Sequence, residues 1–376
     1  MKIGFYSQNF VVLKNYWVNL KDQFDCWWGV PEKNLYRKLN DLGEKKISYH
    51  EEPHFKNEEI RNRNQFISKD SISFQKKIAS EIDPDLWVVD TPNLLNITKE
   101  KIPKIQVFHS LPIKKHVFYK PNLEHDLLFL PGEYHKNKFI DIFKLKYNDS
   151  RLKIVGWPRV DDLINKKFDR NFVLNKIGLD NKKKTVMYAP SWGWGKGNNN
   201  LFCRWNDKEL SVFENLCNSV KELNLNFIVR LHSLSFKAEN KKLIEIAKKY
   251  DVHWQTKETS NYQDDPNESL FVTDILVSDV SGIISEFLVL DRPIIYIDPE
   301  NEEIWAESDM PKNFRAGQVI KDPNELIEAI KNSVNKPDEF SKERNEIVNK
   351  IYANTSGTAS QKASQEIINF INKKFI

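Results

Sequence analysis

The stretch 271–298, FVTDILVSDVSGIISEFLVLDRPIIYID, has the pattern of a complete strand, turn, helix and strand. Its apolar runs, at Asp274–Ser278 and Ile294–Ile297, suit strands that are buried on both faces of a sheet. Between them, Ile283–Leu290 has the length of a short helix, and the DRP sequence that follows would end it. A strand, a helix and a strand in this order are typical of parallel sheets, so the stretch predicts an α/β fold.

The turn Asp279–Gly282 lies between the first of these strands and the helix, at the sheet edge where open α/β folds bind ligands. Free N–H groups at a helix start and the positive end of its dipole favour an anion there. Ser281 adds a hydroxyl group, Gly282 allows close approach to the backbone, and Glu286 suits ribose hydroxyls. We therefore predict a nucleotide phosphate site formed by Asp279, Ser281, Gly282 and Glu286. The alternative is an ordinary helix cap followed by a buried helix.

The length and composition of the chain restrict the class of protein. At 376 residues the chain exceeds the usual size of a single core, and 40% hydrophobic residues with 12% aromatics can fill two. A net charge of +4 from scattered lysines gives no basis for nucleic-acid binding. The three cysteines lack metal spacing and indicate a reducing compartment. No apolar run reaches membrane-spanning length, and polar residues interrupt the amino terminus too early for a signal peptide. We expect a cytoplasmic protein with at most peripheral membrane contact.

Strand-like and helical runs alternate along the whole chain, which favours two Rossmann-like α/β domains whose sheets face a cleft. We expect an amino-terminal domain at 1–160, a lysine-rich linker at 161–183, a carboxy-terminal domain at 184–355, and a last helix at 356–376 that packs back on the first domain. The predicted strands are Ile3–Ser7, Leu86–Asp90, Ile105–Phe108, Leu127–Leu130, Leu152–Val155, Thr185–Ala189, Phe227–Leu231, Val252–Gln255, Ile275–Ser278 and Ile294–Ile297. The predicted helices include Asn34–Leu42, Ser71–Ile82, Lys208–Leu223, Phe236–Tyr250, Pro323–Val334 and Ser360–Phe375.

Several polar residues follow these strands directly. His109 comes after the strand at 105–108, where it suits a general base near neutral pH; the alternative is a histidine hydrogen-bonded in a turn. Arg230 and His232 close the strand at 227–231, where two cationic donors suit a diphosphate; the alternative is an arginine paired with a structural carboxylate.

Other residues at strand ends are weaker candidates. Pro190 and Ser191 end the strand at 185–189, and Arg159 follows another strand at the domain junction. The pair Lys114–Lys115 suits the side of the cleft that binds the acceptor substrate, although such lysine pairs more often lie on a solvated surface. The segment Phe139–Tyr147 predicts either a surface-seeking helix or, as we favour, an amphipathic core helix.

The sequence contains only weak indications of a metal-binding site. Asp83-Pro84-Asp85 has the Asp-x-Asp spacing of some metal-dependent glycosyltransferases, but its proline favours a turn. The adjacent pairs at 161–162 and 264–265 are expected to be solvated. We predict no metal site.

Five segments in order resemble motifs of the CDP-glycerol glycerophosphotransferases, the teichoic-acid primase and polymerase type, which have a two-domain glycosyltransferase-B fold. They are FHSLPIKK at 108–115 for the family's WHGTPLKK, GWPRVD at 156–161 for GYPRND, YAPSW at 188–192 for YAPTW, RLH at 230–232 for RLHP, and DILVSDVSG at 274–282 with LDRP at 290–293 for DILITDYSS with LDRP. The set spans roughly 105–298, and the first hundred residues match only as a generic α/β domain.

The resemblance implies transfer of glycerol phosphate, or a related polyol phosphate, from a CDP-linked donor to a hydroxyl of a lipid-linked or polymeric surface glycan such as teichoic acid or capsule, with release of CMP. It implies that His109 is the base and that Arg230 and His232 bind the donor diphosphate, His232 being a second catalytic residue. Ser281 and Gly282 would hold the nucleotide phosphate. It also implies no cofactor beyond the donor, no metal, and peripheral contact with the inner face of the cytoplasmic membrane.

The chain departs from the family pattern at four positions, with Leu111 for threonine, Gly193 for arginine, Gly282 for serine and Glu286 for aspartate. A Ser-Gly turn followed by a glutamate is also similar to nucleotide-sugar enzymes of the same fold. The alternatives are therefore a glycosyltransferase that uses a nucleotide sugar, and a catalytically silent nucleotide-binding scaffold in polysaccharide assembly.

Overall fold

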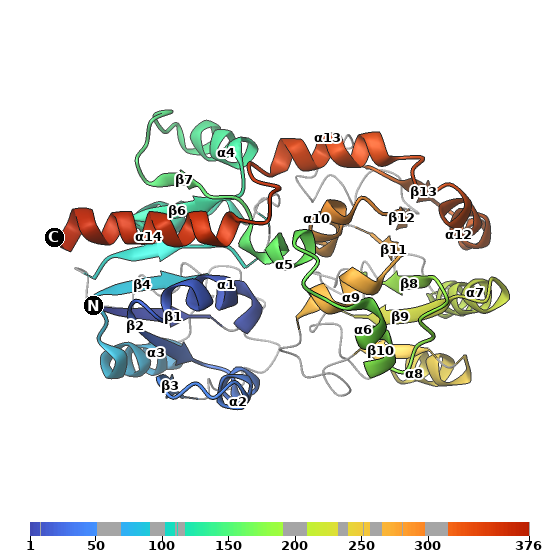
Figure 1. The fold of residues 1–376 in the computed structure, drawn as a ribbon, viewed down its shortest axis with the longest axis horizontal. Helices are drawn as coiled ribbons and strands as arrows, with labels where there is room; N and C mark the ends of the chain where they lie inside the picture. The colour runs from blue at the N-terminus through green and yellow to red at the C-terminus, as the bar shows by residue number, and fades with distance from the viewer. Residues whose placement is uncertain are drawn as a thin grey trace. The chain divides into compact units, whose positions relative to one another are not determined.

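The structure is a computed structural model that describes residues 1–7, 9–50, 69–90, 102–109, 111, 117–190, 209–231, 240–250, 252–255, 265–279, 281–297 and 315–375. The chain divides into two compact units (Figure 1). The first unit runs to Asp161 and includes the end of the chain from Tyr352. The second unit contains Asp162–Ile351.

The first unit is built on a seven-stranded sheet with the order β3-β2-β1-β4-β5-β6-β7, in which every neighbouring pair is parallel. The strands are β1 (Lys2–Tyr6), β2 (Asp25–Val30), β3 (Ile47–Tyr49), β4 (Leu86–Val89), β5 (Lys104–Gln106), β6 (Leu127–Leu130) and β7 (Leu152–Ile154). Ile3 pairs with Cys26 on one side and Leu86 on the other.

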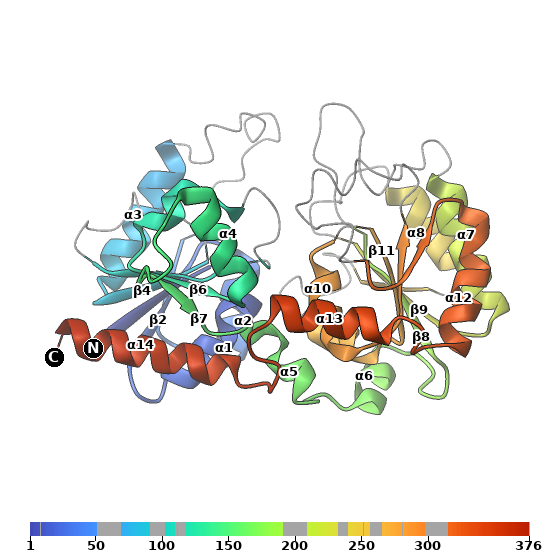
Figure 2. The same cartoon turned by 90° about the horizontal axis from the view of Figure 1, so that it is seen from above.

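Helices cover both faces of this sheet, α1 and α14 on one and α3 and α4 on the other (Figure 2). Side chains along β4 alternate accordingly: Leu86 and Val88 join the core under α1 and α14, whereas Trp87 and Val89 pack with α3. Burial on both faces explains why the strands are continuous apolar runs. The helices are α1 (Phe10–Leu20), α2 (Lys33–Asp41), α3 (Lys69–Ile82), α4 (Glu133–Phe143) and α14 (Ala359–Phe375).

The second unit is built on a six-stranded sheet with the order β10-β9-β8-β11-β12-β13, again parallel throughout. The strands are β8 (Thr185–Tyr188), β9 (Asn226–Arg230), β10 (His253–Gln255), β11 (Ile275–Ser278), β12 (Ile294–Ile297) and β13 (Gln318–Ile320). α7 and α12 pack on one face, in a core that includes Phe213, Leu216, Ala329 and Ile330. The helices are α6 (Arg170–Lys176), α7 (Glu209–Glu222), α8 (Asn240–Lys249), α9 (Pro266–Val272), α10 (Ile283–Phe287), α12 (Leu326–Asn335) and α13 (Ser341–Ile351).

Each sheet has one point at which the strand order reverses. This switch point lies between β1 and β4 in the first unit and between β8 and β11 in the second. In open α/β sheets, ligands bind beyond the carboxyl ends of the strands at such a point. The fold therefore directs attention to the residues that follow these four strands.

Some elements of the structure were not predicted from the sequence, among them α1, β2, β3 and β13. α1 buries seven of its eleven residues, so it lacks the one-sided apolar period that marks a surface helix. β3 and β13 have three residues each, too few for a clear alternation.

The expected linker at 161–183 contains α5 (Asp161–Ile164) and α6, and α6 packs against α9 of the second unit. The expectation that the pair at 161–162 is solvated was wrong. Asp161 and Asp162 are buried, and the Asp161 carboxylate accepts hydrogen bonds from the N–H groups of Ala359 (3.1 Å) and Ser360 (2.7 Å). It therefore caps the start of α14, where a negative charge is favoured. α14 packs against α1.

Within the described ranges, no helix combines the length and the apolar character needed to cross a bilayer.

Candidate functional site

The switch point of the second sheet places Pro190 and Asp279 at one edge. The backbone N–H of Ala189 donates to the Val277 carbonyl (3.0 Å), and the Ser278 hydroxyl donates to the Ala189 carbonyl (2.6 Å). These two bonds tie together the chain that leaves β8 and the chain that leaves β11. Pro190 and Asp279 directly follow them, and both are buried.

Arg230 lies at the same edge of the second sheet. It is the last residue of β9, which pairs with β8 so that Val229 lies opposite Tyr188. Its side chain is half-buried. The structure therefore brings Arg230, Pro190 and Asp279 to the carboxyl ends of three adjacent strands, β9, β8 and β11.

The turn before α10 is open on its outer side. Gly282 precedes the helix in a right-handed conformation (φ −59°, ψ −22°), and a Cβ atom added to it would meet nothing within 4 Å. Ser281 is half-buried, and the Ser285 hydroxyl donates to the Gly282 carbonyl (2.6 Å). Glu286, which we expected to meet ribose hydroxyls, is only 5% exposed.

In the first unit, His109 is exposed and follows the buried residues Val107 and Phe108 after β5. A guanidinium N–H of Arg159 donates to the His109 carbonyl (2.5 Å). Arg159 belongs to a 3₁₀ turn, Pro158–Val160, that follows β7. The structure therefore joins two predicted site residues that lie fifty positions apart in the sequence.

Two residues at the switch point of the first sheet were not predicted as site residues. Ser7 follows β1 and Asp90 follows β4, and the Ser7 hydroxyl donates to Asp90 Oδ2 (2.6 Å). Both residues are buried, and burial raises the Asp90 pKa to about 7. The signal in the sequence was a polar residue at the carboxyl end of each predicted strand.

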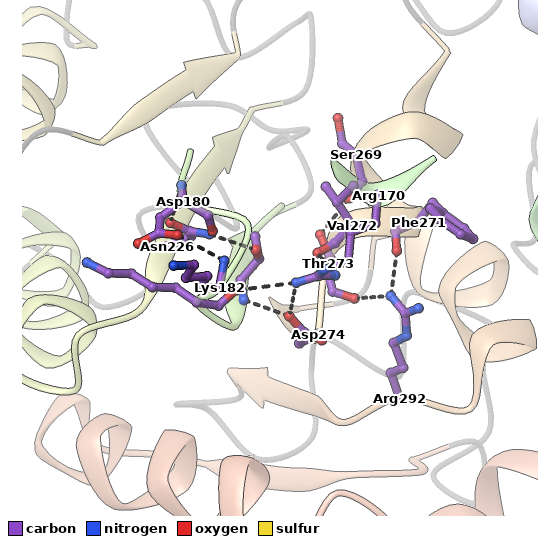
Figure 3. Close-up of polar contacts among 12 residues, drawn as sticks. Arg170, Asp180, Lys182, Asn226, Ser269, Phe271, Val272, Thr273, Asp274 and Arg292 are labelled. Atoms are coloured by element: carbon purple, nitrogen blue, oxygen red, sulfur yellow. Dashed lines mark hydrogen bonds and ion pairs between the residues drawn. The ribbon is translucent and has the colours of Figure 1, made fainter. Parts of the chain in front are cut away.

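The opposite, amino edge of the second sheet carries a polar network (Figure 3). Asp274 Oδ2 accepts hydrogen bonds from Arg170 (2.7 Å) and from the Thr185 N–H (2.8 Å). Arg292 donates to the carbonyls of Phe271 and Thr273, at 2.6 Å each. These bonds fix the starts of β8 and β11 to α9 and α6.

Asp291 extends this network. It ends the helical segment in a left-handed conformation (φ 49°), and its Oδ1 accepts a hydrogen bond from Arg344 Nε of α13 (2.7 Å). Arg344 is 1% exposed and also donates to the carbonyls of Asp291 (3.3 Å) and Pro337 (2.9 Å).

Four predicted site residues, Ser191, His232, Lys114 and Lys115, lie outside the described residues. In the part of the chain that the structure describes, no group of three or more His, Cys, Asp or Glu side chains could hold a metal ion.

A family model described as CDP-Glycerol:Poly(glycerophosphate) glycerophosphotransferase matches residues 4–369. The chain belongs to this family.

Relatives of this glycerophosphotransferase include the teichoic acid glycerol-phosphate transferase of Staphylococcus aureus (strain NCTC 8325 / PS 47), which is 24% identical over 314 residues. That match covers 75% of each chain. The teichoic acid poly(glycerol phosphate) polymerase of Staphylococcus epidermidis (strain ATCC 35984 / DSM 28319 / BCRC 17069 / CCUG 31568 / BM 3577 / RP62A) is 24% identical over 322 residues, which cover 76% of this chain but 41% of the polymerase.

Solved structures show the same fold. The wall teichoic acid polymerase TagF matches with a TM-score of 0.71 and 17% identity, over 99% of this chain and 89% of that chain. UDP-GlcNAc 2-epimerase of Neisseria meningitidis, bound to UDP-GlcNAc, matches with a TM-score of 0.65 and 15% identity, over 98% of this chain and 100% of that chain. The predicted glycosyltransferase-B-like α/β class is confirmed.

The motif residues of this glycerophosphotransferase divide between the two edges of its second sheet. Arg230, Pro190 and Asp279 lie at the carboxyl edge, whereas Asp274 and Arg292 belong to the amino-edge network. The motif residues at the amino edge therefore bond to the fold, whereas those at the carboxyl edge lie where open α/β sheets bind ligands.

Proposed function

We propose that the protein transfers glycerol phosphate from CDP-glycerol to a hydroxyl group of a lipid-linked or polymeric surface glycan and releases CMP. The observation that carries the proposal is the match of the family model to residues 4–369. Staphylococcal relatives whose names specify glycerol-phosphate transfer to teichoic acid support it.

We assign the donor to the carboxyl edge of the second sheet. There the Arg230 guanidinium and His232 would bind the diphosphate, because cationic groups that donate hydrogen bonds suit its negative charge. Ser281 and the open backbone at Gly282 would hold the nucleotide phosphate, with Asp279 and the Pro190–Ser191 segment beside them. Lys114, Lys115 and Arg159 are assigned to the acceptor side.

In the reaction, His109 would accept the proton of the acceptor hydroxyl. The oxygen then attacks the β-phosphorus, the bond from this phosphorus to the bridging oxygen breaks, and CMP leaves with the electron pair. Positive charge from Arg230 and His232 stabilises the leaving phosphate, so we propose that no metal is needed. Excess EDTA should leave the rate unchanged; a loss that Mg²⁺ restores would contradict this.

Thermal unfolding with matched concentrations of CMP, CDP, CDP-glycerol, UDP and UDP-N-acetylglucosamine tests the donor. A ligand that binds only the folded state raises the midpoint, so we expect the cytidine compounds to raise it selectively. A shift selective for the uridine compounds would contradict the proposal. It would favour the second candidate, a nucleotide-sugar glycosyltransferase, which is motivated by Gly282 and Glu286 in place of the family's serine and aspartate.

We also propose a peripheral membrane contact through the end of α4. The inner side of this helix is core, because Phe139 is fully buried. Ile142 is 48% exposed and Tyr147 is 64% exposed, with the Lys136 ammonium 4.2 Å from the Tyr147 ring centroid. Exposed apolar groups beside lysines suit an anionic lipid surface.

Cosedimentation with vesicles that contain phosphatidylglycerol tests this contact. We expect binding that weakens with salt and is reduced in Ile142→Ser, while Phe172→Ser, a change at an exposed aromatic residue of the second unit, leaves it unchanged. Equal binding by wild type and Ile142→Ser would remove α4 from the proposal.

A further inference from the structure

The turn that carries Arg159 is anchored on two sides within the first unit. The Asn15 side chain of α1 donates to the Pro158 carbonyl (2.5 Å), and the Asp161 carboxylate accepts hydrogen bonds from the N–H groups at the start of α14. Gly156, just before the turn, has a φ of 94°, and a Cβ atom added to it would lie 2.8 Å from a side-chain atom of α14. The backbone at 156–161 is therefore held between α1 and α14.

Arg159 reaches from this turn to the main chain of the predicted base. One of its guanidinium N–H groups donates to the His109 carbonyl (2.5 Å), and a charged donor makes such a bond stronger than one between neutral groups. Just before His109, the Val107 N–H donates to the Val89 carbonyl (2.8 Å), and the Phe108 ring packs against α4. The sheet and the core hold the chain up to residue 108, and Arg159 holds it at His109, whose side chain is exposed.

The position of His109 matters for the proposed reaction. A general base has to lie within hydrogen-bond distance of the proton that it accepts, and a displacement of about 1 Å can lower a rate about a hundredfold. The carbonyl that Arg159 holds belongs to His109 itself. Its hydrogen bond therefore limits the backbone rotation that aims the imidazole.

We propose that Arg159 is a positioning residue for His109, and that it acts through the main chain of the base rather than by contact with the reacting atoms. The inference rests on the proposed function, in which His109 is the base, and it gives Arg159 a definite role on the acceptor side. It also makes α1 and α14 part of the support of the base, because these helices hold the turn that carries Arg159.

The test compares kcat and the KM values for donor and acceptor, measured as CMP release by wild type and Arg159→Met. This change removes the hydrogen-bond donor and keeps much of the length of the side chain. We expect kcat to fall about tenfold, because the base is less well placed, and both KM values to stay within about twofold of wild type. An unchanged kcat would overturn the proposal. A raised acceptor KM at an unchanged kcat would assign Arg159 to acceptor binding and overturn it too.

Two further variants separate positioning from general stability. Arg159→Lys restores an N–H donor and the positive charge, so its kcat should lie between those of wild type and Arg159→Met. A kcat no higher than that of Arg159→Met would overturn the proposal.

Arg151→Met is the matched control, because Arg151 is a half-buried arginine of the same unit that donates to another main-chain carbonyl, that of Leu123 (2.6 Å). Its kcat should stay within about twofold of wild type, since it holds no part of the base. A loss in this variant as large as in Arg159→Met would assign the effect to lost stability and overturn the proposal.

A measurement without substrate separates this inference from the proposed function. In protein with ¹³C in the histidine carbonyls and ¹⁵N in serine, coupled signals come from the His-Ser dipeptides at 109–110 and 232–233. The signal that His109→Asn loses identifies His109. A hydrogen bond deshields a carbonyl carbon, so the His109 signal should move upfield in Arg159→Met while the His232 signal stays in place.

An unmoved His109 carbonyl signal in Arg159→Met would overturn the inference alone. Failure of wild type to turn over CDP-glycerol would instead refute the proposed function, in which His109 is the base.

Discussion

Asp274 in the second unit and Asp90 in the first unit lie at opposite edges of their sheets, and their carboxylates are satisfied differently. Asp274, just before β11, accepts hydrogen bonds from Arg170 and from the Thr185 N–H on one oxygen. Asp90, just after β4, has one oxygen paired with Ser7 and the other without a partner among the described residues. The Asp274 carboxylate is tied to the fold by these bonds, whereas Asp90 keeps one buried oxygen unpaired among the described residues, at the edge where open α/β sheets bind ligands.

The largest expected effect is at the amino edge. Arg344→Met removes a buried guanidinium and leaves the carbonyls of Asp291 and Pro337 without this donor. We expect a loss of about 3 kcal/mol in the free energy of unfolding, measured in urea, with kcat/KM of the folded protein unchanged. Lys342→Ala is the control, because Lys342 lies on the same helix in an exposed pair. A loss of activity without a loss of stability would contradict an architectural role.

His135, a buried histidine of the first unit, provides a second comparison of buried ionisable groups between the two units. His135 is fully buried, and burial lowers its pKa to about 3. The histidine of the unfolded chain binds a proton at a higher pH than buried His135 does. The contribution of neutral His135 to stability is therefore complete above about pH 6.5 and declines as the pH falls toward 3. From pH 6.5 to 5 we expect a loss of about 2 kcal/mol, which His135→Phe abolishes. An unchanged pH dependence in His135→Phe, measured by urea unfolding, would be contrary evidence.

A smaller effect is expected at Asp274. Asp274→Asn keeps an oxygen for the Thr185 N–H but loses the charge that attracts Arg170. The free energy of unfolding should fall by about 1–2 kcal/mol. Glu268→Gln, which removes the charge from the exposed pair with Lys176, should cost less than about 0.5 kcal/mol. Equal effects of the two changes would break the distinction between the amino-edge network and an ordinary surface pair.

The sequence predicted best where apolar runs are buried on both faces. β6, β11 and β12 have the predicted boundaries, Leu127–Leu130, Ile275–Ser278 and Ile294–Ile297. α1 was missed because its burial on most sides hides the helical period. The glycerophosphotransferase resemblance, drawn from five short motifs, agrees with the family match over 4–369.

The candidate site was predictable in part. The strand ends indicated His109, Arg230 and Asp279, because parallel strands place their carboxyl ends at one edge. Asp90 was taken as the last residue of a strand. Its hydrogen bond with Ser7, 83 positions away in the sequence, depends on β4 lying beside β1. The architectural role of Arg292 likewise depends on carbonyls that only the folded chain brings near it.

The most direct test of the central claim is CMP release from CDP-glycerol with a lipid-linked acceptor, by wild type, His109→Asn and the control His50→Gln. His50 is a histidine of the same unit that bonds to Glu81 at 2.8 Å. The account predicts turnover by wild type and the control, and a decrease of at least about a hundredfold in His109→Asn. Turnover by His109→Asn at the wild-type rate would contradict His109 as the base, and absence of turnover by wild type would contradict the proposed function itself.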